Sequence, residues 1–174
     1  KNKNIKIFNL AIIPDDVDLK IMDFFYCLED FPNYQIFSNS KSFVKKHFPE
    51  GKIEKKSVEC LKISEFFDKN NIDTIDYLSI DMEGMDYSVL MQLDLKRFKV
   101  ENISFEHLHL TFWQKIKIVT KLINNGYSFS GMGFDVRKSD WMFTKDYNFK
   151  KLQTFLLPIT PRRIWKRYQF STLK

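Results

Sequence analysis

The chain has 174 residues, of which 44% are hydrophobic, so it can bury the core of one domain. Its net charge of +6 is uneven, because positions 147–174 carry seven basic residues and no acidic one. The rest has 21 basic against 22 acidic residues, whereas a nucleic-acid enzyme usually carries basic residues across its domain. We therefore expect no nucleic-acid partner. The basic tail is either solvated or contacts an anionic membrane or a partner.

The two cysteines, Cys27 and Cys60, show no disulfide or metal spacing. We expect buried or half-buried free thiols in a reducing compartment, and therefore a cytoplasmic protein. The chain begins with Lys1 and enters a strand-like run at once, which indicates a portion of a longer protein. No apolar run approaches the ~20 residues that a membrane-spanning helix needs.

In chain order, the N-terminal half predicts three strands and one helix. Pro14-Asp15-Asp16 is a turn signal that separates the first two strands. The stretch 28–51 is polar and aromatic, with Pro and Gly, and we expect a long irregular segment there. The predicted strands are 5–13, 17–26 and 58–61, and the predicted helix is 63–70.

The C-terminal half alternates strands and helices, which predicts an α/β fold with a mainly parallel sheet and helices on its faces. Two closing strands predict an antiparallel hairpin at one edge. We expect the strand 75–80 to be central in the sheet and parallel to the strand 100–105. The other predicted strands are 127–130 and 141–144, and the predicted helices are 84–93 and 113–124.

Polar side chains follow two of these strands. The strand at 75–80 leads into Asp81 and Glu83, and the next strand leads into Glu106 and His107. Ligands of open α/β sheets bind beyond the carboxyl ends of the strands. These residues are therefore the candidates for catalysis, with Asp81, Glu83 and His107 foremost.

A structural interpretation of the same residues is also open. Asp81 would cap the following helix, and Glu83 would lie in its first turn, where the helix dipole favours a carboxylate. His107 and His109 would then be surface or hydrogen-bonded structural residues. Their spacing matches no zinc signature.

The segment 75–90, IDYLSIDMEGMDYSVL, resembles the signature of FkbM-type methyltransferases, an ID-x-L-K-ID-x-EG-x-E-x-x-VL run. Ser79 stands where that pattern has Lys, and Asp86 stands where it has Glu. Weaker similarities precede and follow this segment in the family's order. The resemblance covers roughly residues 5–146.

This resemblance implies a Rossmann-like class I methyltransferase fold that takes S-adenosylmethionine as methyl donor. It also implies a hydroxyl acceptor on a sugar, lipid or secondary metabolite, and it places Asn9, Leu10 and Ala11 near the adenine. The family's glycine-rich loop lies upstream of these three residues. We therefore expect 1–146 to be a partial methyltransferase domain without its N-terminal strands and glycine-rich loop, unable to bind the donor well alone, and 147–174 to be a basic tail.

Methyl transfer to oxygen requires removal of a proton from the acceptor. His107 is the better base, because imidazole titrates nearest to neutral pH. Asp81 and Glu83 would orient the acceptor hydroxyl, or Asp81 would join Glu106 in holding Mg²⁺. The predicted function is thus an O-methyltransferase. The alternatives are a non-catalytic remnant or interaction module with a truncated Rossmann-like fold, and another Rossmann-like enzyme such as a nucleotide-sugar enzyme.

Overall fold

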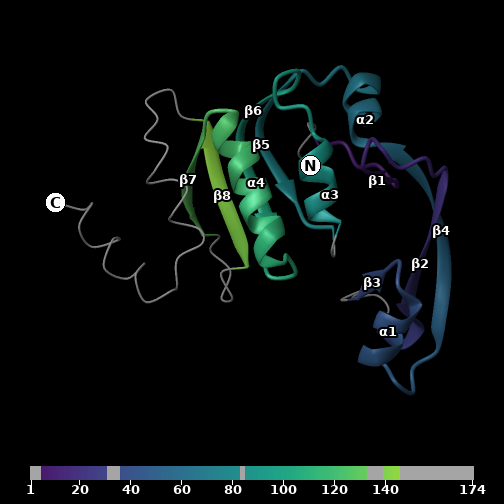
Figure 1. Ribbon diagram of the computed structural model, residues 1–174. Helices are drawn as coiled ribbons and strands as arrows, with labels where there is room; N and C mark the ends of the chain where they lie inside the picture. Colours follow the sequence, from purple (N-terminus) through teal and green to yellow (C-terminus); the bar gives the residue numbers. More distant parts are fainter. Residues whose placement is uncertain (1–4, 31–35, 83–84, 133–138, 146–174) are drawn as a thin grey trace. The chain divides into compact units, whose positions relative to one another are not determined.

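The structure is a computed structural model, and it describes residues 5–30, 36–82, 85–132 and 139–145 (Figure 1). The chain divides into two compact units, Lys1–Phe66 and Phe67–Lys174, each with its own sheet. No helix within the described ranges is long and apolar enough to cross a membrane. The predicted basic tail lies outside the described residues.

The first unit has a four-stranded sheet in the order β1-β4-β2-β3. β4 (Ile53–Lys62) pairs antiparallel with β2 (Ile21–Cys27), and its last residues pair parallel with β1 (Ala11–Ile13). β3 (Phe37–Ser38) adds a short antiparallel edge, and a 3-10 helix, η1 (Leu28–Asp30), follows β2. The strand predicted at 58–61 is the last part of β4, so the strand in the structure is much longer than the predicted one.

The segment predicted to be irregular, 28–51, contains a helix, α1 (Lys41–His47). The helix starts at Ser40, whose hydroxyl accepts a hydrogen bond from the Phe43 amide at 3.3 Å. Val44 is fully buried on the side of α1 that packs against β2. The prediction of an irregular segment was wrong because its Pro and Gly residues lie outside the helix rather than within it.

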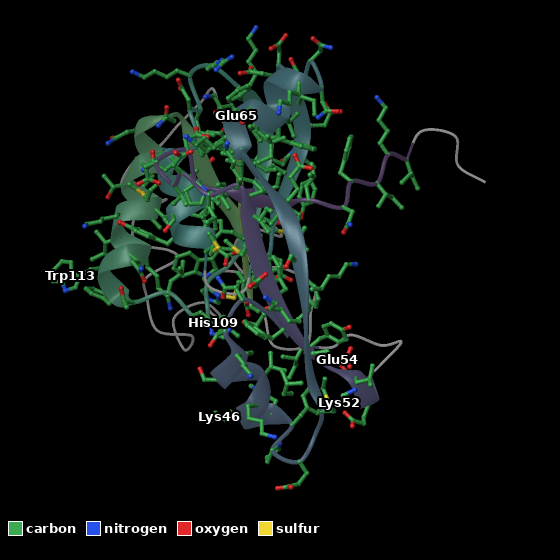
Figure 2. The ribbon with its side chains drawn as sticks, turned by 90° about the vertical axis from the view of Figure 1, so that its right-hand side faces the viewer. Lys46, Lys52, Glu54, Glu65, His109 and Trp113 are labelled. Atoms are coloured by element: carbon green, nitrogen blue, oxygen red, sulfur yellow. The ribbon has the colours of Figure 1, made fainter. Side chains whose placement is uncertain are left out.

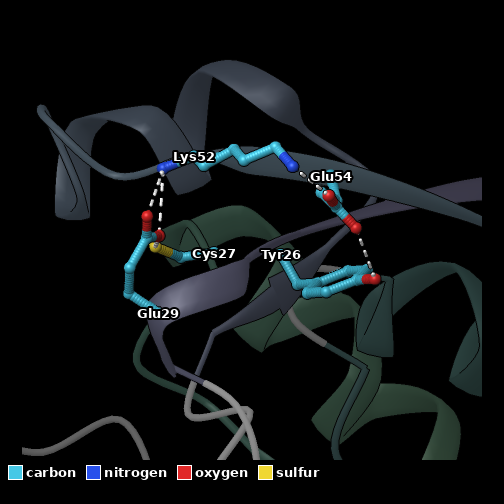
Figure 3. A network of polar contacts seen from close by, with 5 residues as sticks. All are labelled: Tyr26, Cys27, Glu29, Lys52 and Glu54. Atoms are coloured by element: carbon cyan, nitrogen blue, oxygen red, sulfur yellow. Dashed lines mark hydrogen bonds and ion pairs between the residues drawn. The ribbon is translucent and has the colours of Figure 1, made fainter.

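A polar network joins the ends of β2 and β4 (Figure 3). The Cys27 thiol donates to Glu29 at 2.9 Å, and the same carboxylate accepts the Lys52 amide at 3.0 Å. The Lys52 ammonium pairs with Glu54 at 2.8 Å, and Tyr26 donates to the other Glu54 oxygen at 3.3 Å. The hydrogen bond between Cys27 and Glu29 lowers the pKa of the Glu29 carboxylate and raises the pKa of the Cys27 thiol. Both cysteines of the chain are buried free thiols, as predicted.

The second unit has a four-stranded sheet in the order β5-β6-β8-β7. β5 (Thr74–Ile80) is parallel to β6 (Lys99–Glu106), β8 (Asp140–Lys145) is antiparallel to β6, and β7 (Tyr127–Met132) closes the hairpin with β8. The parallel pair and the edge hairpin confirm two predictions. The prediction of a mainly parallel sheet was wrong, because each described sheet is mixed with one parallel pair. β5 also lies at the edge of its described sheet rather than at its centre.

Helices α3 (Asp86–Gln92) and α4 (Phe112–Asn124) belong to the second unit, and α2 (Ile63–Lys69) spans the boundary between the units. α4 begins with a capping box, in which Thr111 and Gln114 exchange hydrogen bonds of 2.8 and 3.3 Å. α4 packs against β7 and α3. The buried side chains of α4 are Ile118, Val119, Leu122 and Ile123.

The two faces of the second sheet differ in chemistry. Phe105 and Phe143, on adjacent strands, are buried and stacked with ring centroids 6.0 Å apart. On the other face the Tyr77 hydroxyl donates to Ser104 at 2.7 Å, and Ser104 donates to Ser79 at 3.2 Å. The alternation of side chains along each strand separates these two sets. Ser79, which stands where the FkbM-type pattern has Lys, is therefore part of a hydrogen-bonded row of three hydroxyl groups.

Candidate active site at the ends of β5 and β6

The parallel pair β5–β6 brings the predicted site residues of the second unit together. Ile80 is the register partner of Phe105, so the next residues along the two strands, Asp81 and Glu106, take neighbouring positions. Asp81 is exposed, and His107 follows Glu106 directly. The carboxyl ends of these strands thus carry two carboxylates and an imidazole.

Asp81 does not cap the helix that follows it. The N-cap of α3 is Met85, and the acidic residue in its first turn is Asp86. Asp86 is 2% exposed, and its Oδ1 accepts a hydrogen bond from the Met82 amide at 3.3 Å, which closes the turn after β5. The helix-capping interpretation of Asp81 was therefore wrong. Glu83 lies outside the described residues.

His107 is buried and held in one orientation by the chain beyond β7. Its backbone amide donates to the Ser139 carbonyl at 2.9 Å, and its ring Nδ1 hydrogen-bonds to the same oxygen. The ring lies against Trp141, with centroids 4.5 Å apart. A carbonyl oxygen only accepts, so Nδ1 must carry a proton, and in the neutral ring the lone pair is on Nε2. That arrangement suits a general base.

Trp141 adds a donor beside this imidazole. Its side chain is 2% exposed, and its indole Nε1 has no hydrogen-bond partner in the described part of the chain. Buried indole N–H groups are usually paired, so an unpaired one next to a candidate base calls for an explanation. Sequence reasoning assigned Trp141 only to a closing strand, because nothing local marks its N–H as unpaired.

The proposed metal ligands receive no support from the geometry. His109 Nε2 lies 3.5 Å from Glu106 Oε2, and the His109 side chain is largely exposed (Figure 2). Among the residues that the structure describes, no three His, Cys, Asp or Glu side chains gather where they could hold a metal ion. Asp81 and Glu106 therefore do not fit a Mg²⁺ site formed by described residues.

The residues assigned to the adenine lie in the first unit, at the amino end of β1. Asn9 is exposed, Leu10 is half-buried, and Ala11 starts the strand. The carboxyl end of β1 leads instead to Asp15, whose Oδ1 accepts the Ser64 amide at 3.1 Å and hydroxyl at 2.8 Å. Asp15 thus fastens the start of α2, a role that the sequence marked only as a turn.

A glycine-rich strand-to-helix turn, which grips nucleotide cofactors in open α/β folds, is not found in the described residues. Their two glycines with positive φ are Gly126, between α4 and β7, and Gly131, within β7.

The fold and these strand ends define an α/β protein with a polar site where two parallel strands finish. The methyltransferase FkbM domain matches residues 3–135. The chain therefore belongs to the FkbM methyltransferase family, which confirms the resemblance drawn from the sequence and implies methyltransferase activity. The chain matches no curated protein and no solved structure.

Proposed function

We propose that this chain is part of an S-adenosylmethionine-dependent O-methyltransferase that acts on a hydroxyl of a sugar, lipid or secondary metabolite. Family membership supports methyl transfer in general. The observation that carries the oxygen acceptor is the orientation of His107, whose Nδ1 is bound to the Ser139 carbonyl. A hydroxyl must lose its proton when its oxygen is methylated, and Nε2 of this buried ring can take that proton.

When bound, S-adenosylmethionine supplies a methyl group on a positively charged sulfur. The chain's own residues handle the acceptor: Nε2 of His107 removes the hydroxyl proton, and the Ser139 carbonyl stabilises the imidazolium that results. Asp81 is exposed at the neighbouring strand end, where it accepts a hydrogen bond from the substrate that receives the methyl group and so orients that substrate. The indole N–H of Trp141, which has no partner in the described part of the chain, donates to an oxygen of this substrate beside the His107 ring.

The test is turnover of the full-length protein with a labelled methyl donor and a panel of hydroxyl acceptors, together with calorimetric titration of the donor. His107→Asn removes the base but leaves an amide that can still donate to the Ser139 carbonyl. We expect turnover to fall by ~10²–10⁴-fold with the melting temperature nearly unchanged.

The matched control is His47→Asn. His47 is also hydrogen-bonded to a backbone carbonyl, that of Phe43, at 3.0 Å, but it lies on α1 in the first unit. We expect wild-type turnover in this variant. Equal turnover in the His107 and His47 variants would remove the base, and absence of donor binding by the full-length protein would favour a non-catalytic remnant.

A further inference from the structure

Three large apolar side chains are exposed together around the start of α4. We call this set the aromatic end of α4; it consists of Leu108, Phe112 and Trp113, whose residue exposures are 44%, 58% and 70%. The rings of Phe112 and Trp113 pack edge to face with centroids 5.5 Å apart. Figure 2 shows Trp113 projecting outward from the helix. A cluster of large apolar side chains left in water commonly marks a contact surface.

The fold does not need these side chains for its core. Positions 113, 117, 120 and 124 of α4 are exposed, so Trp113 begins the solvent-facing stripe of the helix rather than its buried face. The helix start is already held by the capping box of Thr111 and Gln114. Among the described residues of the second unit, Trp113 therefore lies outside the packed core.

The charged side chains that follow this surface along the chain are lysines, whereas Glu106, which precedes it, pairs with His109 at 3.5 Å. The sequence contains no Asp or Glu from position 107 to 134, and the lysines in that stretch all lie on α4. Lys117 lies one helical turn after Trp113 and is exposed. Lys121 instead binds the carbonyls of Met91 and Leu93 at the end of α3. Exposed aromatic side chains beside an exposed lysine are typical of proteins that contact the interface of an anionic bilayer.

We propose that the aromatic end of α4 docks on the surface of an anionic lipid bilayer. Leu108, Phe112 and Trp113 enter the headgroup region, and Lys117 pairs with lipid phosphate. Because His107 directly precedes Leu108, docking brings the candidate base to the membrane surface, and the acceptor is then a hydroxyl presented by a lipid. The identity of the acceptor rests on the proposed function, whereas the docking itself does not.

The docking test is binding of the full chain to vesicles of phosphatidylcholine, alone or mixed with phosphatidylserine. We expect binding only to the anionic vesicles, and weaker binding at high salt, which screens such attraction over ~10 Å or less. Trp113→Ser and Phe112→Ser should each reduce the affinity about tenfold. Trp113→Phe should keep most of the binding but lose most of the fluorescence quenching by brominated lipid.

Ile7→Ser is the matched control, because Ile7 is 90% exposed but lies in the first unit; we expect it to bind as the parent does. A second variant changes Arg162, Arg163, Lys166 and Arg167 to Ala, and the effect of Trp113→Ser should persist in it. Parental binding by the Trp113 and Phe112 variants overturns the proposal. Self-association through these side chains without vesicle binding also overturns it, in favour of a protein interface. Vesicle binding without methyl transfer supports the docking and counts against the proposed function alone.

Discussion

The two described acidic residues around the turn after β5 have different expected roles, so one pair of variants separates catalysis from stability. Asp81 is exposed and takes no part in capping α3, whereas Asp86 is 2% exposed and accepts the Met82 amide at 3.3 Å. We expect Asp81→Asn to reduce methyl transfer and leave the free energy of unfolding unchanged. We expect Asp86→Ala to reduce the free energy of unfolding.

The magnitudes follow from these environments. Asp86→Ala leaves the Met82 amide without its acceptor, which costs about 1–3 kcal/mol, and removes a first-turn carboxylate worth about 0.3–1 kcal/mol. Asp81→Asn changes an exposed side chain, so its effect on stability should stay within about 0.5 kcal/mol. If Asp81 orients the acceptor, turnover should fall at least ~10²-fold, or ~2.7 kcal/mol on the barrier.

The assay is turnover and thermal melting of both variants of the full-length protein, side by side. At ~2–4 °C per kcal/mol for a chain of this size, the Asp86 variant should melt several degrees lower. Wild-type turnover in Asp81→Asn refutes the orienting role. A melting temperature lowered equally in both variants refutes the reasoning that only Asp86 holds the turn.

Three further variants test the packing, each by denaturant unfolding. Lys121→Met removes a charged donor to two carbonyls at the end of α3, which should reduce the free energy of unfolding by about 1.5–3 kcal/mol. Burial lowers the pKa of Lys121, so the desolvation cost that the variant avoids offsets part of this loss. An unchanged unfolding midpoint contradicts the prediction. Trp141→Phe removes an N–H without a described partner but also shrinks a buried ring that contacts Phe105 and His107, so it should cost about 1–3 kcal/mol through lost packing; parental stability would contradict that packing role. Gly51→Ala places a Cβ 2.5 Å from Cys27 Sγ and should cost ~1–3 kcal/mol, whereas parental stability would show that the thiol yields.

The second unit was largely predictable because its signals are local. Compact apolar runs gave β5 and β6, and helical periodicity followed by Asn125-Gly126 gave α4 and its end at a glycine of positive φ. The direction of strands was less predictable, since a hairpin and a crossover leave similar apolar patterns in a single sequence. The antiparallel hairpin of the second sheet was predicted, whereas the antiparallel pairs of the first sheet were missed.

The length of β4 was missed for a different reason. Its first half carries exposed lysines, so no apolar run marks it as a strand. The structure shows what holds it: Asp23 on β2 accepts the Lys55 ammonium at 2.9 Å and the Ser57 hydroxyl at 2.6 Å across the antiparallel pair. Such pairing over some thirty residues has no local signature.

The candidate site, like the fold, could be predicted from the sequence only in part. Asp81 and His107 were predictable because the carboxyl ends of adjacent strands are a recurrent place for ligands. The roles of Asp15 and Trp141 were not, because they depend on contacts with residues distant in the sequence. The bond from His107 to Ser139 spans 32 positions and decides which ring nitrogen carries the proton.

The segment between β6 and α4 links the proposed chemistry to the proposed docking surface. It is anchored at both ends: the His107 amide donates to Ser139, and the Leu110 amide donates back to the His107 carbonyl at 3.2 Å. His107 and Leu110 are buried, so the two residues between them, Leu108 and His109, must lie outside. Consecutive Cα atoms are 3.8 Å apart, so a base turned inward and an apolar side chain turned outward are separated by about one residue length. The proposed base and the proposed docking surface therefore belong to one anchored segment of the second unit.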